Sequence, residues 1–578
     1  MAEKSLEAAP ALPPFAQWIE HGGKLTRALD PFGIGAAFAR VAQGWLANPA
    51  KLAETLSELA RDTQTLQLHL WQCATGLHPP PCINIAPDDE RFTDPAWTEI
   101  PVYSALKQAY LLSTHWSQRA LYETPGVSAD DRRRAAFWQR QWMNALAPTN
   151  FFFTNPVAIR KFFESGGRSV VDGLRLWLED LRVGDVQMVD RSAFKVGKNL
   201  ATTPGAVVYR NDLMELIQYA PTTGRVRATP LVFIPPWINK YYILDLNEKK
   251  SLVRHLVDRG YTVFMVSWKN PTAKQADTTF DDYLIEGAAT AISVAREICR
   301  TRHVHAAGYC IGGTALAALM AWYNREHEKA SAVPVAHWTL FASLVDFSRP
   351  GAIEVFINPE TIETLEEIMA RQGYLDGREM GRSFRMLRSN SLIWHYFVHS
   401  YLYGEAPPAF DVLYWNTDVT RMPRAMHSFY LREFYLNNKL VKKDALTLAG
   451  HPIDLGRIRQ PLYAVGCQED HIAPWKAAYK IAGKIGAPVR HTLSSSGHIL
   501  GIINPPVSPP KRSYWSGEAH ASSPDEWLKH QRETPGTWWE DWVAWLDERC
   551  GRQVPARRPG SRKHPLIAPA PGTYVHEL

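Results

Sequence analysis

The pattern of hydrophobic and polar residues changes at about residue 190. Before this point it is mostly helical, for example over residues 36–59 and 134–146. From about residue 200, short apolar runs alternate with helical patterns, as in proteins built on a parallel α/β sheet. We therefore expect a helical N-terminal domain over residues 1–190 and an α/β domain over residues 191–578.

Six apolar runs in the second region predict strands of one sheet. They cover residues 231–234, 262–266, 304–309, 338–344, 462–465 and 489–493. Helices are expected between them, at 249–258, 281–299 and 313–326. The alternation stops between about 347 and 450, where aromatic and helix-forming residues prevail. A hydrolase would carry its cap or lid in such an insertion, and an ordinary helical excursion gives the same pattern.

A nucleophile elbow is predicted where the third strand meets the following helix. Residues 308–313 read GYCIGG, which is the pattern G-x-S-x-G with Cys310 in place of serine. The glycines allow a strained turn and a close approach of the backbone. The start of the helix favours a thiolate. The backbone N–H of Ile311 is then placed to stabilise an oxyanion.

An acid and a histidine follow two later strands. Asp470 comes after the fifth strand, and His498 lies in a loop of small residues after the sixth. The order nucleophile, acid, histidine is that of α/β hydrolases. Glu469 is an alternative acid. His471 is an alternative base, but beside the acid in sequence it would hardly reach Cys310, so it is interpreted as a loop-stabilising residue.

Composition narrows the class of protein. The 64 Lys and Arg against 58 Asp and Glu give a net charge of +6 over 578 residues, which does not indicate a nucleic-acid binder. The first residues lack the apolar core of a signal peptide, and no apolar run approaches the roughly 18 residues of a membrane span. The six scattered cysteines fit a reducing cytoplasm. His303 and His305 have no matching ligands, so no metal or other cofactor is expected.

Tryptophan is abundant, with 21 residues. A rich core and a binding or interface surface explain this number equally well. Trp538, Trp542 and Trp545 are spaced along one face of a helix, for which core packing is the favoured interpretation.

At these residues the sequence resembles the polyhydroxyalkanoate synthases, which polymerise 3-hydroxyacyl-coenzyme A (CoA) into storage polyester. The resemblance runs from about residue 90 to the end, while the first 85 or so residues match little. Besides the elbow, the matching stretches are residues 155–156, 164–167, 196–199, 235–242, 266–271, 410–418, 469–475, 496–499 and 503–506.

The resemblance implies an α/β-hydrolase fold with Cys310 as nucleophile, His498 as general base and Asp470 as acid. Trp237, Tyr309 and Trp415 are expected to contact the acyl substrate. The single long chain is similar to class I or II synthases rather than to the shorter class III type, which needs a partner subunit. Class I is favoured, which implies short-chain substrates. The family also implies homodimers and residence at polyester granules in the cytoplasm.

Two rival functions stay open. A cysteine-dependent thioesterase or polyester hydrolase of the same fold would admit water to the acyl enzyme. A non-catalytic granule-coating protein would use the tryptophan-rich surface, although it would have no use for a triad. A thiol that exchanges with a thioester forms another thioester at little energetic cost, which favours an acyltransferase.

Overall fold

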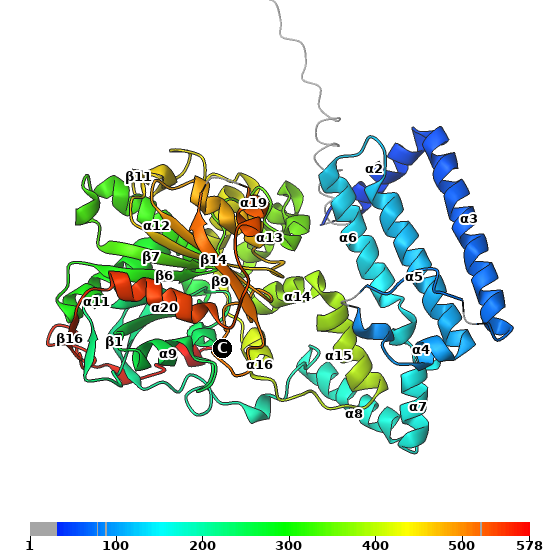
Figure 1. Cartoon of the computed structure of the whole chain (residues 1–578), viewed down its shortest axis with the longest axis horizontal. Helices are drawn as coiled ribbons and strands as arrows, with labels where there is room; N and C mark the ends of the chain where they lie inside the picture. The colour runs from blue at the N-terminus through cyan, green and yellow to red at the C-terminus, as the bar shows by residue number, and fades with distance from the viewer. Residues whose placement is uncertain (1–29, 31, 78, 87–88, 521–522) are drawn as a thin grey trace, which may run out of the picture. The chain divides into compact units, whose positions relative to one another are not determined.

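A computed structural model of the chain describes residues 30–578, except 31, 78, 87, 88, 521 and 522. Residues 1–29, which belong to the segment that matches the family little, therefore lie outside the described residues. The chain divides into two compact units, one of Met1–Val170 with Asn358–Leu365 and one of Val171–Ile357 with Glu366–Leu578. Each unit is described by itself (Figure 1).

The first unit is helical. Its four long helices are α2 (Ile34–Leu46), α3 (Pro49–Ala74), α5 (Pro101–Tyr122) and α6 (Ala129–Ala145). The single helix expected over 36–59 is two helices, because Pro49 has no N–H to continue α2 and instead opens α3. One small core joins α2 to the α5–α6 pair through the buried residues Ala37, Val41, Leu121, Ala135 and Ala136.

The second unit is built on an eleven-stranded sheet in the order β15-β14-β13-β12-β7-β6-β4-β5-β2-β1-β17. Its centre is parallel, and it consists of the six strands that the sequence predicted: β4 (Leu231–Ile234), β5 (Val263–Trp268), β6 (Val304–Tyr309), β7 (Val335–Phe341), β12 (Leu462–Cys467) and β13 (Val489–Ser494). With the family match reported below, this architecture confirms the expected α/β fold class.

Antiparallel strands extend both edges of this centre. On one side lie β2 (Met214–Tyr219), β1 (Gly205–Arg210) and β17 (Ala568–Pro569), and on the other lie β14 (Ser513–Ala519) and β15 (Thr534–Pro535). The sequence did not predict these five strands. Strand β7 also begins and ends three residues before its expected bounds, because the chain turns at Ala342, where φ is 42°.

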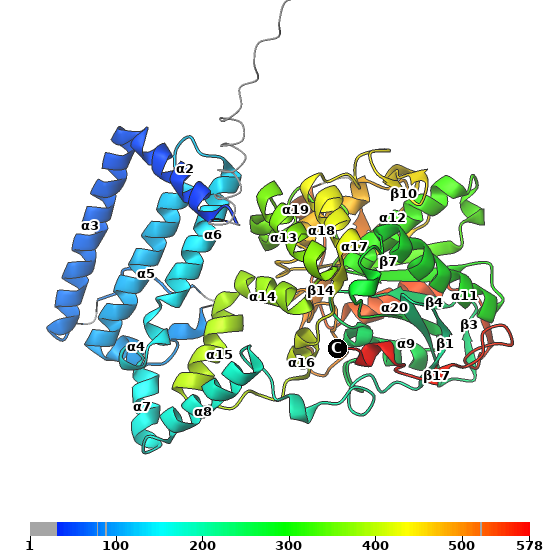
Figure 2. The ribbon, with the colours of Figure 1, turned by 180° about the vertical axis from the view of Figure 1, so that it is seen from behind.

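Helices cover both faces of the sheet. Figure 1 shows α9 (Leu252–Asp258) and α20 (Trp538–Arg549) on the face toward the viewer, and Figure 2 shows α11 (Thr290–Cys299) and α12 (Ile311–Glu326) on the other. Apolar side chains on both faces of the central strands are buried, as continuous hydrophobic strands require. The tryptophans of α20 are buried against the sheet, as their spacing predicted.

The stretch between β7 and β12 contributes no described strand to the central sheet. It carries helices that include α13 (Pro359–Gln372), α14 (Gly377–Leu387), α16 (Asp411–Thr417) and α17 (Arg424–Phe429), and the last continues as the π-helix η12 (Tyr430–Leu436). This is the insertion that the sequence located at about 347–450. Its residues Asn358–Leu365 group with the first unit.

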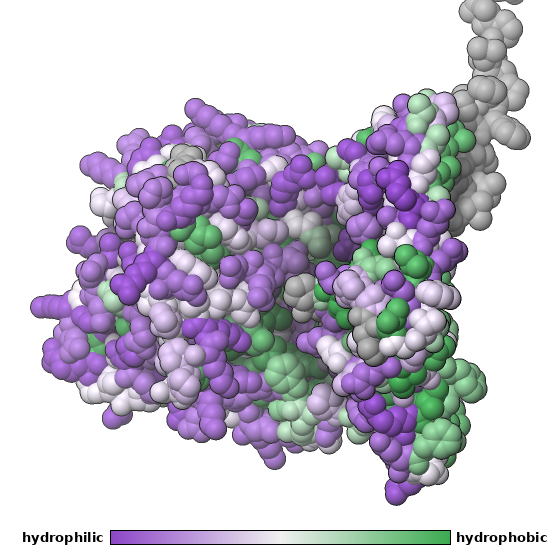
Figure 3. Space-filling view, turned by 45° about the vertical axis from the view of Figure 1, so that its right-hand side comes forward, coloured by the Kyte–Doolittle hydropathy of each residue, from purple (hydrophilic) through white to green (hydrophobic). Residues whose placement is uncertain are grey.

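Helix α8 (Arg168–Val183) exposes apolar side chains along one face. Six of them are between 41% and 68% exposed: Val170, Val171, Leu174, Trp177, Leu178 and Leu181. Figure 3 shows apolar surface, coloured green, toward the lower edge of the molecule, where α8 lies. Contiguous apolar surface of this kind marks sites of interaction with other molecules. Within the described residues, no helix has both the length and the apolar character that crossing a membrane requires.

Candidate active site

Cys310 occupies a strained turn directly after β6. Its φ is 53° and its ψ is −124°, a conformation that costs free energy and that the surrounding structure must impose. A β-carbon on Gly308 would lie 2.5 Å from the Cα of Gly313. One on Gly312 would lie 2.3 Å from the carbonyl oxygen of Ile234. The glycines of the motif are therefore required by close backbone contacts, and they present the thiol at the carboxyl edge of the sheet.

The carboxyl ends of β12 and β13 bring Asp470 and His498 together. His498 Nδ1 lies 2.6 Å from Asp470 Oδ2. The other carboxylate oxygen, Oδ1, accepts the backbone N–H groups of Ile472 and Ala473, each at 2.8 Å. Both side chains are buried. The carboxylate is thus fixed from two sides, and it orients the imidazole as in a nucleophile–histidine–acid triad.

Cys310 lies close enough to His498 to interact electrostatically with the ring. Because Nδ1 faces Asp470, Nε2 is the nitrogen that remains for the thiol. Burial by itself lowers the pKa of His498, but Asp470 and then Cys310 favour the charged ring and together raise the pKa well above its ordinary value. The structure therefore places the hydrogen-bonded pair of His498 and Asp470 beside Cys310.

The two alternatives for acid and base occupy other positions. Glu469 is exposed, and its backbone N–H donates to the Ser496 carbonyl. His471 Nδ1 is buried and has no hydrogen-bond partner among the residues that the structure describes. Burial, reinforced by Arg388, lowers the pKa of His471 to about 4. The carbonyl of His471 accepts the N–H of Ala352 at 3.0 Å, so the residue holds a loop through its backbone.

Ile311 is the first residue of helix α12. An N–H at this position has no intrahelical acceptor and points out of the helix start. The carbonyl of Cys310 meanwhile accepts from Gly313 and Thr314, which anchors the first turn. The N–H of Ile311 is available beside the sulfur, where an oxyanion donor is expected.

The three residues expected to contact substrate lie close to the core. Tyr309 donates its hydroxyl to the His498 carbonyl at 3.0 Å, and its ring stacks on the imidazole at a centroid distance of 5.5 Å. Trp415 donates to the Lys240 carbonyl at 2.6 Å. Each is at most 4% exposed. Tyr309 thus contacts the base itself, and contact of either residue with substrate stays a prediction.

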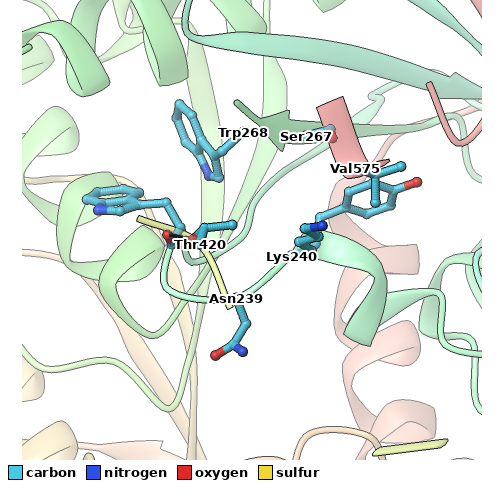
Figure 4. A pocket seen from close by; sticks show the side chains of 8 residues that line it. Asn239, Lys240, Ser267, Trp268, Thr420 and Val575 are labelled. Atoms are coloured by element: carbon cyan, nitrogen blue, oxygen red, sulfur yellow. Dashed lines mark hydrogen bonds between the residues drawn. The ribbon is translucent and has the colours of Figure 1, made fainter. Parts of the chain in front are cut away.

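Trp237 lines a small pocket of about 10 Å³ together with Trp268, Lys240 and Thr420 (Figure 4). Its indole packs against Tyr283 at a centroid distance of 4.4 Å, and its buried N–H has no acceptor in the described part of the chain. The pocket has room for about one water molecule. A role of Trp237 in substrate binding therefore also stays a prediction.

Two tyrosines near Cys310 were not anticipated from the sequence. Tyr430 and Tyr435, both on η12, have their ring centroids 5.2 Å apart, and each interacts electrostatically with Cys310. Burial raises the pKa of both phenols, so they stay protonated. No motif marks them. The one available indication is the density of aromatic residues in the insertion. Among the described residues, no group of three or more His, Cys, Asp or Glu could hold a metal ion.

Family models match two parts of the chain. Residues 88–256 match the N-terminal region of poly-beta-hydroxybutyrate polymerase, and residues 229–505 match the α/β-hydrolase fold. The mostly parallel sheet and the elbow after β6 agree with the second match. The molecule is therefore an α/β-hydrolase-fold protein with a helical N-terminal region.

Curated relatives define the family further. A poly(3-hydroxyalkanoate) polymerase of Methylorubrum extorquens is 41% identical over 96% of this chain and 91% of its own. A poly(3-hydroxyalkanoate) polymerase subunit of Cupriavidus necator is 43% identical over 91% and 88%, respectively. A corresponding subunit of Rhizobium meliloti is 39% identical over 93% and 87%. The chain belongs to the poly(3-hydroxyalkanoate) polymerases, a family of acyltransferases, and the expected resemblance is confirmed.

Proposed function

We propose that this protein polymerises 3-hydroxyacyl-CoA into polyhydroxyalkanoate through an acyl group carried on Cys310. One observation carries the proposal: the buried, hydrogen-bonded pair of His498 and Asp470, with Cys310 in electrostatic interaction with the His498 ring, at the carboxyl ends of three strands. Family membership supplies the class of reaction, and this geometry supplies the residues.

In the first step the Cys310 sulfur attacks the thioester carbonyl of the substrate. The tetrahedral oxyanion is stabilised by the Ile311 N–H. In such folds a second donor comes from the loop after an earlier strand, which here is the loop after β4. The carbon–sulfur bond to CoA then breaks, and the protonated His498 gives its proton to the departing thiolate. One thioester has replaced another.

In the second step the 3-hydroxyl of another 3-hydroxyacyl-CoA attacks acyl-Cys310. His498 accepts the hydroxyl proton, a new ester bond forms, and the Cys310 thiolate leaves and recovers the proton. The product is a CoA thioester longer by one unit. It acylates Cys310 again, so that one nucleophile is sufficient for elongation.

Three further parts of the proposal concern substrate and assembly. The similarity to class I synthases favours short-chain substrates such as 3-hydroxybutyryl-CoA and a homodimer. The exposed apolar face of α8 supports contact with the surface of the polyester granule, because an ester polymer offers an apolar surface to cover it.

Replacing Cys310 by Ala should abolish polymer formation and leave the fold intact. The assay follows polymer and free acid from a panel of 3-hydroxyacyl-CoA lengths. Cys299→Ala, at a buried cysteine in α11, is the matched control and should keep full activity. Substantial polymerisation by folded Cys310→Ala protein would exclude this nucleophile. Free 3-hydroxy acid without polymer from the wild type would favour the thioesterase alternative.

The insertion at 347–450 belongs to the proposal as a mobile cap over the site. Tyr430 and Tyr435 support this role, because they bring the insertion to Cys310. Limited proteolysis of the full chain with a non-hydrolysable acyl-CoA should show protection within 347–450, compared with unliganded protein. Equal cleavage in both samples would argue against a cap that closes on substrate.

A further inference from the structure

A second pocket of the α/β unit lies beside the loop that carries His498. Its volume is about 240 Å³, below the roughly 300–1,000 Å³ of sites for drug-sized ligands. The backbone N–H of Ser513 donates to Ser495 Oγ at 3.0 Å, which ties the pocket wall to the His498 loop. Its polar lining residues are Asn504, Lys511, Arg512, Tyr514, Thr537 and Glu540.

Two cations line this pocket without an ion-pair partner. Arg512 is half-buried, and its guanidinium makes one long hydrogen bond, 3.5 Å to the Ile503 carbonyl. Burial lowers the pKa of Arg512, although Cys467 and Glu469 act in the opposite direction. Within the described residues, no salt bridge of Arg512 or Lys511 with a carboxylate occurs. A half-buried guanidinium with most of its donors unused is costly unless an anion pairs with it.

Asn504 adds a neutral donor. It is 4% exposed, and its Nδ2 has no acceptor among the described residues. Its backbone carbonyl accepts the hydroxyl of Thr537, so the residue is held in place at the pocket. Buried amide donors without a partner are rare in native proteins and require an explanation.

The pocket also borders the start of helix α20, which is twelve residues long. Gly536 and the N-cap residue Thr537 belong to its lining. The positive end of the helix dipole favours a negative charge there. The acidic residue of the lining, Glu540, has its Oε1 2.6 Å from Arg259, so its charge is already balanced.

We propose that this pocket binds a phosphate group. Lys511 and Arg512 line a volume suited to a small anion, and the start of helix α20 borders it. A phosphate fits better than a carboxylate, because its several oxygens can accept donors from different directions. The group has two possible sources with the same chemistry, the 3′-phosphate of CoA and free inorganic phosphate. The first source rests on the proposed function, and the second does not.

Titration calorimetry of the full chain with CoA, 3′-dephospho-CoA and inorganic phosphate tests the proposal. Arg512→Gln should weaken binding of the anion by about tenfold, the effect of losing a charge-assisted hydrogen bond. Lys511 is exposed, so Lys511→Gln keeps the fold and should weaken the same ligand. If the two variants bind CoA more weakly but bind 3′-dephospho-CoA as the wild type does, the bound group is the 3′-phosphate of the substrate. If they bind inorganic phosphate more weakly but bind CoA as the wild type does, the ligand is free phosphate.

Arg552→Gln is the matched control, because Arg552 is exposed and also lies outside the ion pairs of the described residues. Unchanged binding of all three ligands by Arg512→Gln and Lys511→Gln would overturn the proposal. An equal loss in Arg552→Gln would overturn it too, since it would reflect overall charge. Inorganic phosphate binding by Cys310→Ala protein should match the wild type, which separates this site from the proposed reaction.

Discussion

Two buried groups that contain histidine lie at opposite ends of the parallel strands of the sheet. At the carboxyl ends, His498 bonds to Asp470 and its pKa is raised. Near the start of β6 and β7, His305 Nδ1 lies 2.7 Å from His337 Nδ1 with no carboxylate in the cluster. Burial lowers the pKa of His305 well below its ordinary value and that of His337 to about 4. The comparison teaches that burial alone keeps an imidazole neutral, and that one fixed carboxylate reverses this preference.

The tautomers of the neutral cluster follow from its partners. His337 Nε2 must donate to the Arg549 carbonyl, 3.2 Å away, so its Nδ1 accepts from His305. His305 Nε2 then accepts from the Thr339 hydroxyl at 3.0 Å. Thr339 Oγ1 in turn accepts from Trp542 at 2.9 Å. Every donor has an acceptor while both rings are neutral. A proton added to His337 Nδ1 would face the N–H of His305, and one added to His305 Nε2 would displace the hydrogen bond that the Thr339 hydroxyl donates.

Removing the Asp470 carboxylate should have the largest effect, because it takes away the group that distinguishes His498 from the neutral histidines. Asp470→Asn keeps the size of the side chain but loses the charge that orients and stabilises protonated His498. Elongation should fall by about 10⁴-fold, the effect of the corresponding change in a serine protease. The first acylation should fall less, because a thiol near pKa 8.5 needs little help to ionise, whereas the hydroxyl of the second step is a far weaker acid.

Intact-mass spectrometry after brief exposure to 3-hydroxyacyl-CoA, alongside a polymerisation rate, measures both steps of Asp470→Asn. Acyl-Cys310 should accumulate. Glu469→Gln, at the exposed neighbouring acid, is the control and should elongate normally. Equal losses in acylation and elongation would show that Asp470 serves both steps alike.

The neutral cluster should make stability depend on pH. The pKa of His337 is about 4 in the fold against about 6.5 in an unfolded chain, so the unfolded state binds more protons in between. The contribution of neutral His337 to the free energy of unfolding is therefore fully present above pH 6.5 and is lost as the pH falls toward 4. Near pH 4, His337 should account for about 3 kcal/mol of this loss.

His337→Gln can keep both hydrogen bonds but cannot titrate. The urea midpoint of unfolding, followed by tryptophan fluorescence, should decrease less between pH 7.5 and pH 4.5 in this variant than in the wild type. Other buried histidines titrate in both proteins, so the difference between them carries the information. His520→Gln, at an exposed histidine, should behave as the wild type. An identical pH dependence of all three proteins would contradict the neutral cluster.

The smallest effect concerns the support of His498. Tyr309→Phe removes the hydroxyl that donates to the His498 carbonyl but keeps the stacked ring. A single hydrogen bond of about 1 kcal/mol predicts about a fivefold lower kcat with little change in KM. Steady-state polymerisation kinetics measure this. A raised KM with unchanged kcat would instead support contact of Tyr309 with the acyl group.

The sequence predicted those elements that a short local pattern of residues defines. The six central strands are continuous apolar runs, and Cys310, Asp470 and His498 each follow one of them. Strand β17 was not predicted because it is two residues long and pairs with the distant β1, and β14 was not predicted because it is partly exposed. The positions of Tyr430 and Tyr435 could not be predicted either, because they depend on how the insertion folds back toward β6.

The π-helical winding of η12 has a consequence for the length of the insertion. In a π-helix, hydrogen bonds join residues five apart, so residues 430 and 435 fall about one turn apart on the same side. In an ordinary α-helix the same spacing would turn one phenol well away from the other. Losing one residue from this segment would restore the shorter turn and separate the pair. We therefore expect η12 to tolerate substitutions more readily than the deletion of a residue. The number of residues in η12 matters to the site as much as its aromatic side chains do.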